Sequence, residues 1–167
     1  MQVNSQSDPT ALIERLVAEA TPRTGALDAW RSFLQAHATL MRRLAADLAE
    51  TTELSLGDFD VLAQLALAGG ELRMSELATR AFSSRSGMTR RVARLVDEGL
   101  VARASDEADA RGVVVALTEA GIHRLAGAAP VHLRGVVELF VSQLTDTELA
   151  LLKRALDKVT VDSSFGI

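Results

Sequence analysis

Residues 83–101 read SSRSGMTRRVARLVDEGLV, and the interpretation of the whole chain depends on this stretch. Its apolar residues recur at steps of three and four, the spacing of a helix with one buried side. With the apolar residues placed inward, Arg90 and Arg94 fall on the opposite, exposed side. This arginine face is either a solvated stripe with ion pairs to Asp97 and Glu98, or a surface for a polyanion.

The arginines lie within an acidic protein. The chain has 167 residues and a formal net charge of −4, but the segment from Arg80 to Arg103 holds six arginines against two acids. Serines 83, 84 and 86 add hydroxyl groups at the expected helix start, where free backbone N–H groups also favour anions. Small side chains there would let the helix enter a DNA major groove, which is about 12 Å wide. The pattern favours DNA as the surface that the arginines face.

The neighbouring sequence predicts a helix-turn-helix followed by a β-hairpin. Helix caps, glycine stops and apolar spacing set the expected boundaries. Before the quoted stretch we expect helices from Pro9 to the TPRTG break, from Leu27 to about Glu50, from Ser55 to Gly69-Gly70, and from a Ser75 cap to near Phe82. After it we expect short strands at 100–104 and 112–117, a helix from Thr118 to about Val141 that Pro130 kinks or breaks, and a last helix opened by the capping box of Thr145 and Glu148.

Composition excludes several classes of protein. No stretch approaches the roughly 18 uninterrupted apolar residues of a membrane span, and the first ten residues have no signal-peptide pattern. The absence of cysteine excludes disulfides, thiolate metal sites and control by thiol oxidation. The three histidines are not spaced as metal ligands, and the serines lack a nucleophile motif. We therefore expect a cytoplasmic protein with no enzymatic activity, no metal and no cofactor.

Three segments together resemble the MarR family of bacterial transcriptional regulators. They are LSLGDFDVLAQLA (54–66), LRMSELATRAFSSRSGMTRRVARLVDEGLVAR (72–103) and DEADARGVVVALTEAG (106–121). The resemblance implies a mainly α fold with a small β-hairpin wing, in one compact single-domain protomer. Its parts would be an N-terminal arm (1–25), a dimerisation helix (26–53), a winged helix-turn-helix (54–117) and C-terminal dimerisation helices (118–167).

The family resemblance also implies a function. The protein would be a homodimeric regulator, in our reading a repressor, that binds double-stranded DNA at a pseudo-palindromic operator with half-sites about one helical turn apart. A small aromatic or phenolic effector would release it. The alternative is a winged-helix module that has lost DNA binding and holds a protein partner. The arginines and hydroxyls of the quoted helix favour DNA, since a protein-binding face tends toward exposed aromatic residues.

The resemblance assigns roles to individual residues. Asp109 would hold the tip of the wing in place. At that tip Ala110 precedes Arg111, where many relatives have two basic residues, and acidic residues lie close by. The implied DNA contacts are Ser84, Arg85, Ser86, Thr89, Arg90, Arg94 and, in the minor groove, Arg111. The candidate effector-lining residues are Trp30, His37, Phe59 and His132, each of which could instead be a core residue.

Overall fold

The computed structural model describes residues 8–20, 25–105 and 112–161. The predicted fold class, mainly helical with a small β wing, is confirmed. The chain divides into two units, residues 1–39 and residues 40–167.

The first unit is helical and carries exposed apolar side chains. Helix α1 (Pro9–Ala20) has no buried residue, and its apolar side chains Leu12, Ile13 and Leu16 are about half exposed. Helix α2 (Ala26–Thr51) begins in this unit and continues into the second. Both helices have the amphipathic pattern that the sequence predicts, but within residues 8–20 and 27–39 no apolar side chain is buried.

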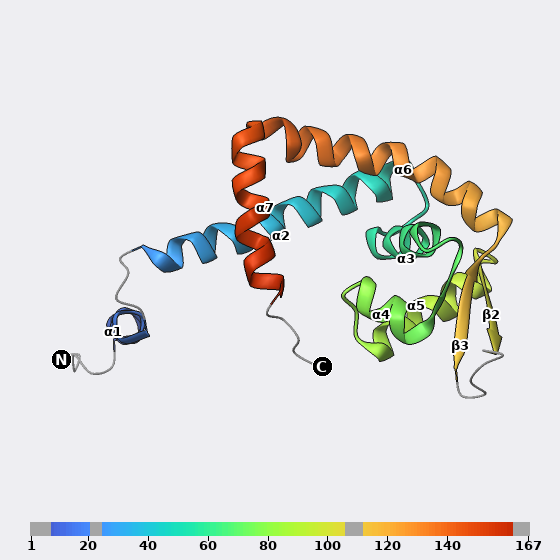
Figure 1. The fold of residues 1–167 in the computed structure, drawn as a ribbon, viewed down its shortest axis with the longest axis horizontal. Helices are drawn as coiled ribbons and strands as arrows, with labels where there is room; N and C mark the ends of the chain where they lie inside the picture. Colours follow the sequence, from blue (N-terminus) through green and yellow to red (C-terminus); the bar gives the residue numbers. More distant parts are fainter. Residues whose placement is uncertain (1–7, 21–24, 106–111, 162–167) are drawn as a thin grey trace. The chain divides into compact units, whose positions relative to one another are not determined.

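The second unit contains the helix-turn-helix and the wing (Figure 1). Helix α3 packs against α6, α4 packs against α5, and α5 packs against strand β2. Residues 40–51 of α2 also belong to this unit. Its other elements are α3 (Leu56–Leu67), β1 (Glu71–Arg73), α4 (Met74–Arg80), α5 (Arg85–Asp97), β2 (Val101–Ser105), β3 (Val113–Leu117), α6 (Glu119–Leu139), the 3-10 turn η2 (Val141–Gln143) and α7 (Asp146–Val161).

One apolar core holds most of these elements together, with no described residue of η2 or α7 in it. It joins the end of α2 and the inner sides of α3, α4 and α5 to the base of the sheet. The largest fully buried side chains are Leu48, Leu54, Leu62, Leu65, Leu77, Met88, Leu95, Val61, Val92 and Val115. Because three of them lie on α5, that helix is fixed in rotation about its axis and its other side faces solvent.

The sheet has three antiparallel strands in the order β1-β3-β2. Strands β2 and β3 form the predicted hairpin, with Val101 opposite Leu117 and Ser105 opposite Val113. The third strand, β1, was not predicted from the sequence. It pairs Leu72 with Val115 and contains only three residues directly after a glycine pair, too short a run for an alternating pattern.

One predicted helix start was wrong, and of the two alternatives for Pro130, a kink or a break, the break was wrong. Helix α4 begins at Met74 with Arg73 at the cap position and no capping side-chain hydrogen bond, so Ser75 is not the cap. Helix α6 continues through Pro130 to Leu139, so the proline does not break it. Pro130 and Ala126 are both exposed, and water can therefore reach the Ala126 carbonyl that the proline leaves unbonded.

The capping box before α7 is confirmed. Glu148 accepts hydrogen bonds from the backbone N–H and the hydroxyl of Thr145, each at 2.8 Å, and the hydroxyl accepts one from the Glu148 N–H at 3.3 Å. The hydrogen bonds from Thr145 hold the pKa of the Glu148 carboxyl below its usual range. The helix start is thus specified by two residues that are adjacent in space.

Candidate DNA-binding surface

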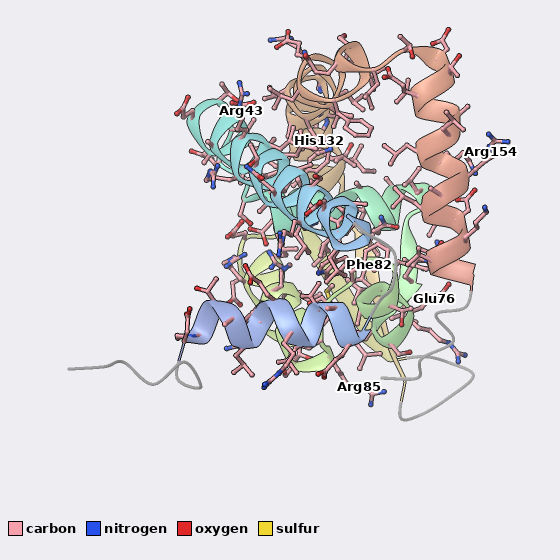
Figure 2. The ribbon with its side chains drawn as sticks, turned by 90° about the vertical axis from the view of Figure 1, so that its left-hand side faces the viewer. Arg43, Glu76, Phe82, Arg85, His132 and Arg154 are labelled. Carbon is pink, nitrogen blue, oxygen red and sulfur yellow. The ribbon has the colours of Figure 1, made fainter. Side chains whose placement is uncertain are left out.

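Helix α5 presents one side to the core and the other to solvent. The Ser84 hydroxyl caps its first turn by accepting a hydrogen bond from the Gly87 N–H at 3.1 Å. Figure 2 shows Arg85 at the beginning of this helix, with its side chain extending outward. The six residues predicted on this helix as DNA contacts are all exposed: Ser84, Arg85, Ser86, Thr89, Arg90 and Arg94.

Arg94 is exposed, and it also pairs with two acidic side chains. Its Nη2 donates to the Asp58 carboxylate of α3, and its Nε lies 3.8 Å from Glu98. The neighbouring Arg91 donates from Nη1 to the same Asp58 oxygen at 3.2 Å. The predicted exposure of Arg94 is confirmed, and so is the intrahelical pair with Glu98, whereas the ion pair with Asp58 was not predicted.

Asp58 is buried, is held by a hydrogen bond from its own helix start, and has space for the Arg91 guanidinium beside it. Asp58 is 6% exposed, the one charged side chain that is buried in the described parts of the chain. Its second carboxylate oxygen accepts a hydrogen bond from the Ser55 hydroxyl at 2.5 Å. A Cβ on Gly57 would overlap Nη1 of Arg91, so the missing side chain makes room for the guanidinium. From the sequence, Asp58 was interpreted only as part of the helix start, because its partners are 33 and 36 residues away.

An arginine of the wing contacts α5. Arg103 of β2 donates from Nη2 to the Thr89 carbonyl at 3.0 Å, and the Thr89 hydroxyl donates to the Arg85 carbonyl at 2.9 Å. The hydrogen bond from Arg103 fixes the first wing strand against the exposed helix. The sequence showed Arg103 only as one of a cluster of arginines.

The turn between α4 and α5 holds an unusual residue. Phe82 has φ 47° and is 99% exposed. The Phe82 N–H donates to the Thr79 carbonyl at 3.2 Å, and the Ser83 N–H donates to the Ala78 carbonyl at 2.9 Å. These two bonds form the Schellman arrangement that ends α4 and requires a left-handed residue at this place.

Two of the four predicted effector residues contact each other. The rings of Phe59 on α3 and His132 on α6 lie with centroids 4.5 Å apart. Nδ1 of His132 is buried and has no hydrogen-bond partner in the described residues. Burial lowers the pKa of His132, and the nearby charge of Asp60 partly opposes this shift. An unsatisfied polar nitrogen beside an aromatic ring is a place where a ligand hydroxyl or acid group could bond.

The other predicted residues divide into two groups. Trp30 and His37 lie on the first part of α2, where Phe33 stacks between them at centroid distances of 6.0 and 6.3 Å. They belong to the unit of residues 1–39, whereas Phe59 and His132 belong to the unit of residues 40–167. Asp109 and Arg111, predicted at the tip of the wing, lie outside the described residues.

Comparison with known proteins gives a consistent result. The family model for the MarR family matches residues 52–112. The crystal structure of AbsC, a MarR family transcriptional regulator from Streptomyces coelicolor, is 31% identical with a TM-score of 0.77, over 83% of this chain and 93% of that one. Sco3205 from the same organism, solved in complex with DNA, is 29% identical with a TM-score of 0.78, over 83% and 90%.

The resemblance extends to a second DNA complex. A cysteine-to-serine mutant of MarR from E. coli, in complex with operator DNA, is 28% identical with a TM-score of 0.68, over 80% of this chain and 94% of that one. Among curated proteins, none matches the chain.

Proposed function

The chain belongs to the MarR family of transcriptional regulators, and from this premise we propose that it is a homodimeric repressor of a pseudo-palindromic operator, released by a small aromatic or phenolic effector. Its general activity, DNA binding in transcription regulation, follows from the family. The observation that carries the sequence-specific part is the exposed side of α5, where serine, threonine and arginine side chains follow a serine-capped helix start.

The geometry supports reading of bases by this helix. Arg85 and Arg90 are exposed, and neither forms an ion pair within the part of the chain that the structure describes. An arginine with all its donors available can bond a guanine through two atoms in the major groove. Arg111 and Asp109 remain our proposal for the wing, with Arg111 in the minor groove and Asp109 as a structural residue.

A second copy of the chain would explain the apolar side chains that α6 and α7 leave exposed. Residues 119–143 are long and apolar enough to cross a membrane by composition, with only 11% of the best window buried. For a DNA-binding regulator, burial against a second copy accounts for this surface, and we place the protein in the cytoplasm. The exposed large apolar side chains in the described parts of these helices are Ile122, Leu133, Val137, Leu151, Leu156 and Val159.

Control by an effector rests on Phe59 and His132. A phenol or aromatic acid could stack on Phe59 and bond the unsatisfied Nδ1 of His132. Since α3 and α6 pack against each other, a ligand there could shift the helix-turn-helix relative to the C-terminal helices. In a dimer such a shift would spoil simultaneous binding of both half-sites and reduce affinity without changing a base contact.

The test is selection of binding sites from sheared genomic DNA at about 150 mM salt, where non-specific phosphate binding is weak. We expect enrichment of one pseudo-palindrome and protection of it in a footprint. Arg90→Ala should weaken the enrichment and relax it at one base pair, whereas Arg154→Ala, which removes an exposed arginine from α7, should leave it unchanged. A folded dimer that enriches no sequence would favour the protein-binding alternative.

A further inference from the structure

The arginines of α5 fall into two classes. Within the described residues, Arg85 and Arg90 form no ion pair, whereas Arg91 and Arg94 share one oxygen of the Asp58 carboxylate. The side chains of Arg91 and Arg94 are 33% and 53% exposed, so part of each guanidinium still reaches solvent. Two arginines that look equivalent in sequence to Arg90 are therefore bound to an acid from another helix.

We propose that Asp58 is a specificity-determining positioning residue that restrains Arg91 and Arg94 and limits binding to DNA of unrelated sequence. This inference rests on the proposed function. It follows from the position of the carboxylate, which α3 holds through the Ser55 hydroxyl and beside which Gly57 leaves space for Arg91. The carboxylate cannot follow the arginines toward DNA, because its other oxygen is bound within its own helix.

Restraint has opposite effects on the two kinds of DNA binding. Non-specific affinity depends on how many phosphates the protein neutralises, and a buried carboxylate cancels one positive charge at this surface. Specific binding needs donors in fixed positions, and a guanidinium with five N–H groups can keep one bond to Asp58 while presenting its other edge. Asp58 thus lowers affinity for any duplex and preserves the geometry needed for the operator.

The size of the effect follows from counterion release. Loss of one opposing charge adds about one phosphate contact, which steepens the dependence of log affinity on log salt by about 0.9. When Asp58→Asn and the wild-type chain bind a random duplex equally at about 1 M salt, this slope makes the variant bind it about fivefold more tightly at about 150 mM salt. Operator affinity should stay the same or fall, so the ratio of specific to non-specific affinity decreases.

The experiment compares Asp58→Asn with the wild-type chain on the selected operator and on a random duplex of equal length, between about 50 and 250 mM salt. Glu53→Gln is the matched control, because Glu53 also pairs with an arginine from another element, Arg124 at 3.1 Å, and its loss also removes one negative charge. We expect a steeper salt slope and tighter random binding for Asp58→Asn and neither change for Glu53→Gln. A purely structural role would instead weaken binding to both duplexes.

A second variant keeps the test decisive if Asp58→Asn does not fold. Gly57→Ala leaves every charge in place but puts a methyl group where the Arg91 guanidinium lies. It should release Arg91 from Asp58 and, like Asp58→Asn, raise the affinity for the random duplex. Salt slopes and affinity ratios equal to wild type in the folded variants would overturn the inference. Wild-type protein that binds no operator would instead refute the proposed function, so the two failures can be told apart.

Discussion

Phe82 should be replaceable by glycine with a gain in stability. Three helices of this chain end in the same Schellman arrangement, each with a left-handed residue after the last turn. That residue is Gly69 after α3 and Gly99 after α5, with φ of 90° and 71°. After α4 it is Phe82, with φ 47°, although glycine is the residue that adopts this conformation without strain.

The magnitude follows from two opposing terms. A left-handed conformation costs a residue with a side chain about 1–2 kcal/mol, and the greater freedom of glycine in the unfolded chain costs about 0.5–1 kcal/mol. Because the Phe82 side chain is 99% exposed, its removal loses almost no apolar burial. Phe82→Gly should therefore raise the free energy of unfolding by about 1 kcal/mol, which is about 2–4 °C in Tm for a chain of this size.

The assay is urea and thermal unfolding of wild type, Phe82→Gly and Phe82→Ala at one protein concentration, since dimerisation would make Tm depend on concentration. Phe82→Ala is the control, because alanine removes the ring but keeps the strain, and its stability should equal that of wild type. Lower stability of Phe82→Ala would refute the reasoning, because it would show that the ring is buried against a second copy of the chain or another molecule.

Other predictions concern DNA binding, assembly and pH. Arg90→Ala should cost about 1–3 kcal/mol of operator affinity and relax preference at one base pair; uniform loss on all sequences would make it a phosphate contact. Removal of the chain from Thr145 onward should give a monomer in sedimentation, and a truncated dimer would contradict the assigned dimerisation helix. Burial holds the pKa of His132 below its usual 6.5, and the charge of Asp60 partly opposes this shift. As the pH falls, His132 is therefore protonated at a higher pH in the unfolded chain than in the folded one. The free energy of unfolding should therefore fall as pH drops below about 6.5, and His132→Gln should flatten this fall.

Local sequence signals predicted most of the fold. Apolar spacing placed Met88, Val92 and Leu95 on one side of α5, and all three are fully buried. Hydroxyl side chains before a helix identified the helix starts at Ser55 and Thr118, and a turn at Ser83-Ser84 where Ser84 is the cap. These features could be predicted from the sequence because each depends on residues within one or two helical turns of one another.

Features that depend on contacts between residues far apart in the sequence could not be predicted from these local signals. Strand β1 exists because Leu72 pairs with Val115, and a run of three residues carries no signal for that pairing. The contact of Phe59 with His132 joins α3 to α6 and was not predicted, since the family resemblance gave each residue only as a candidate effector-lining residue. The contact of Arg103 with the Thr89 carbonyl likewise depends on how the wing folds back on α5.

The charge of the DNA-binding surface shows the consequence of these distant contacts. Counted along the sequence, the arginine-rich segment has a local net charge of +4, from six arginines and two acids. In the fold, Arg80 pairs with Glu76 at 2.7 Å, and Asp58 holds both Arg91 and Arg94. The arginine count therefore overstates the number of cations available to phosphates. A surface of this kind binds DNA weakly through charge alone, so the proposed dimer would gain its operator affinity mainly from base contacts and from the simultaneous binding of two half-sites.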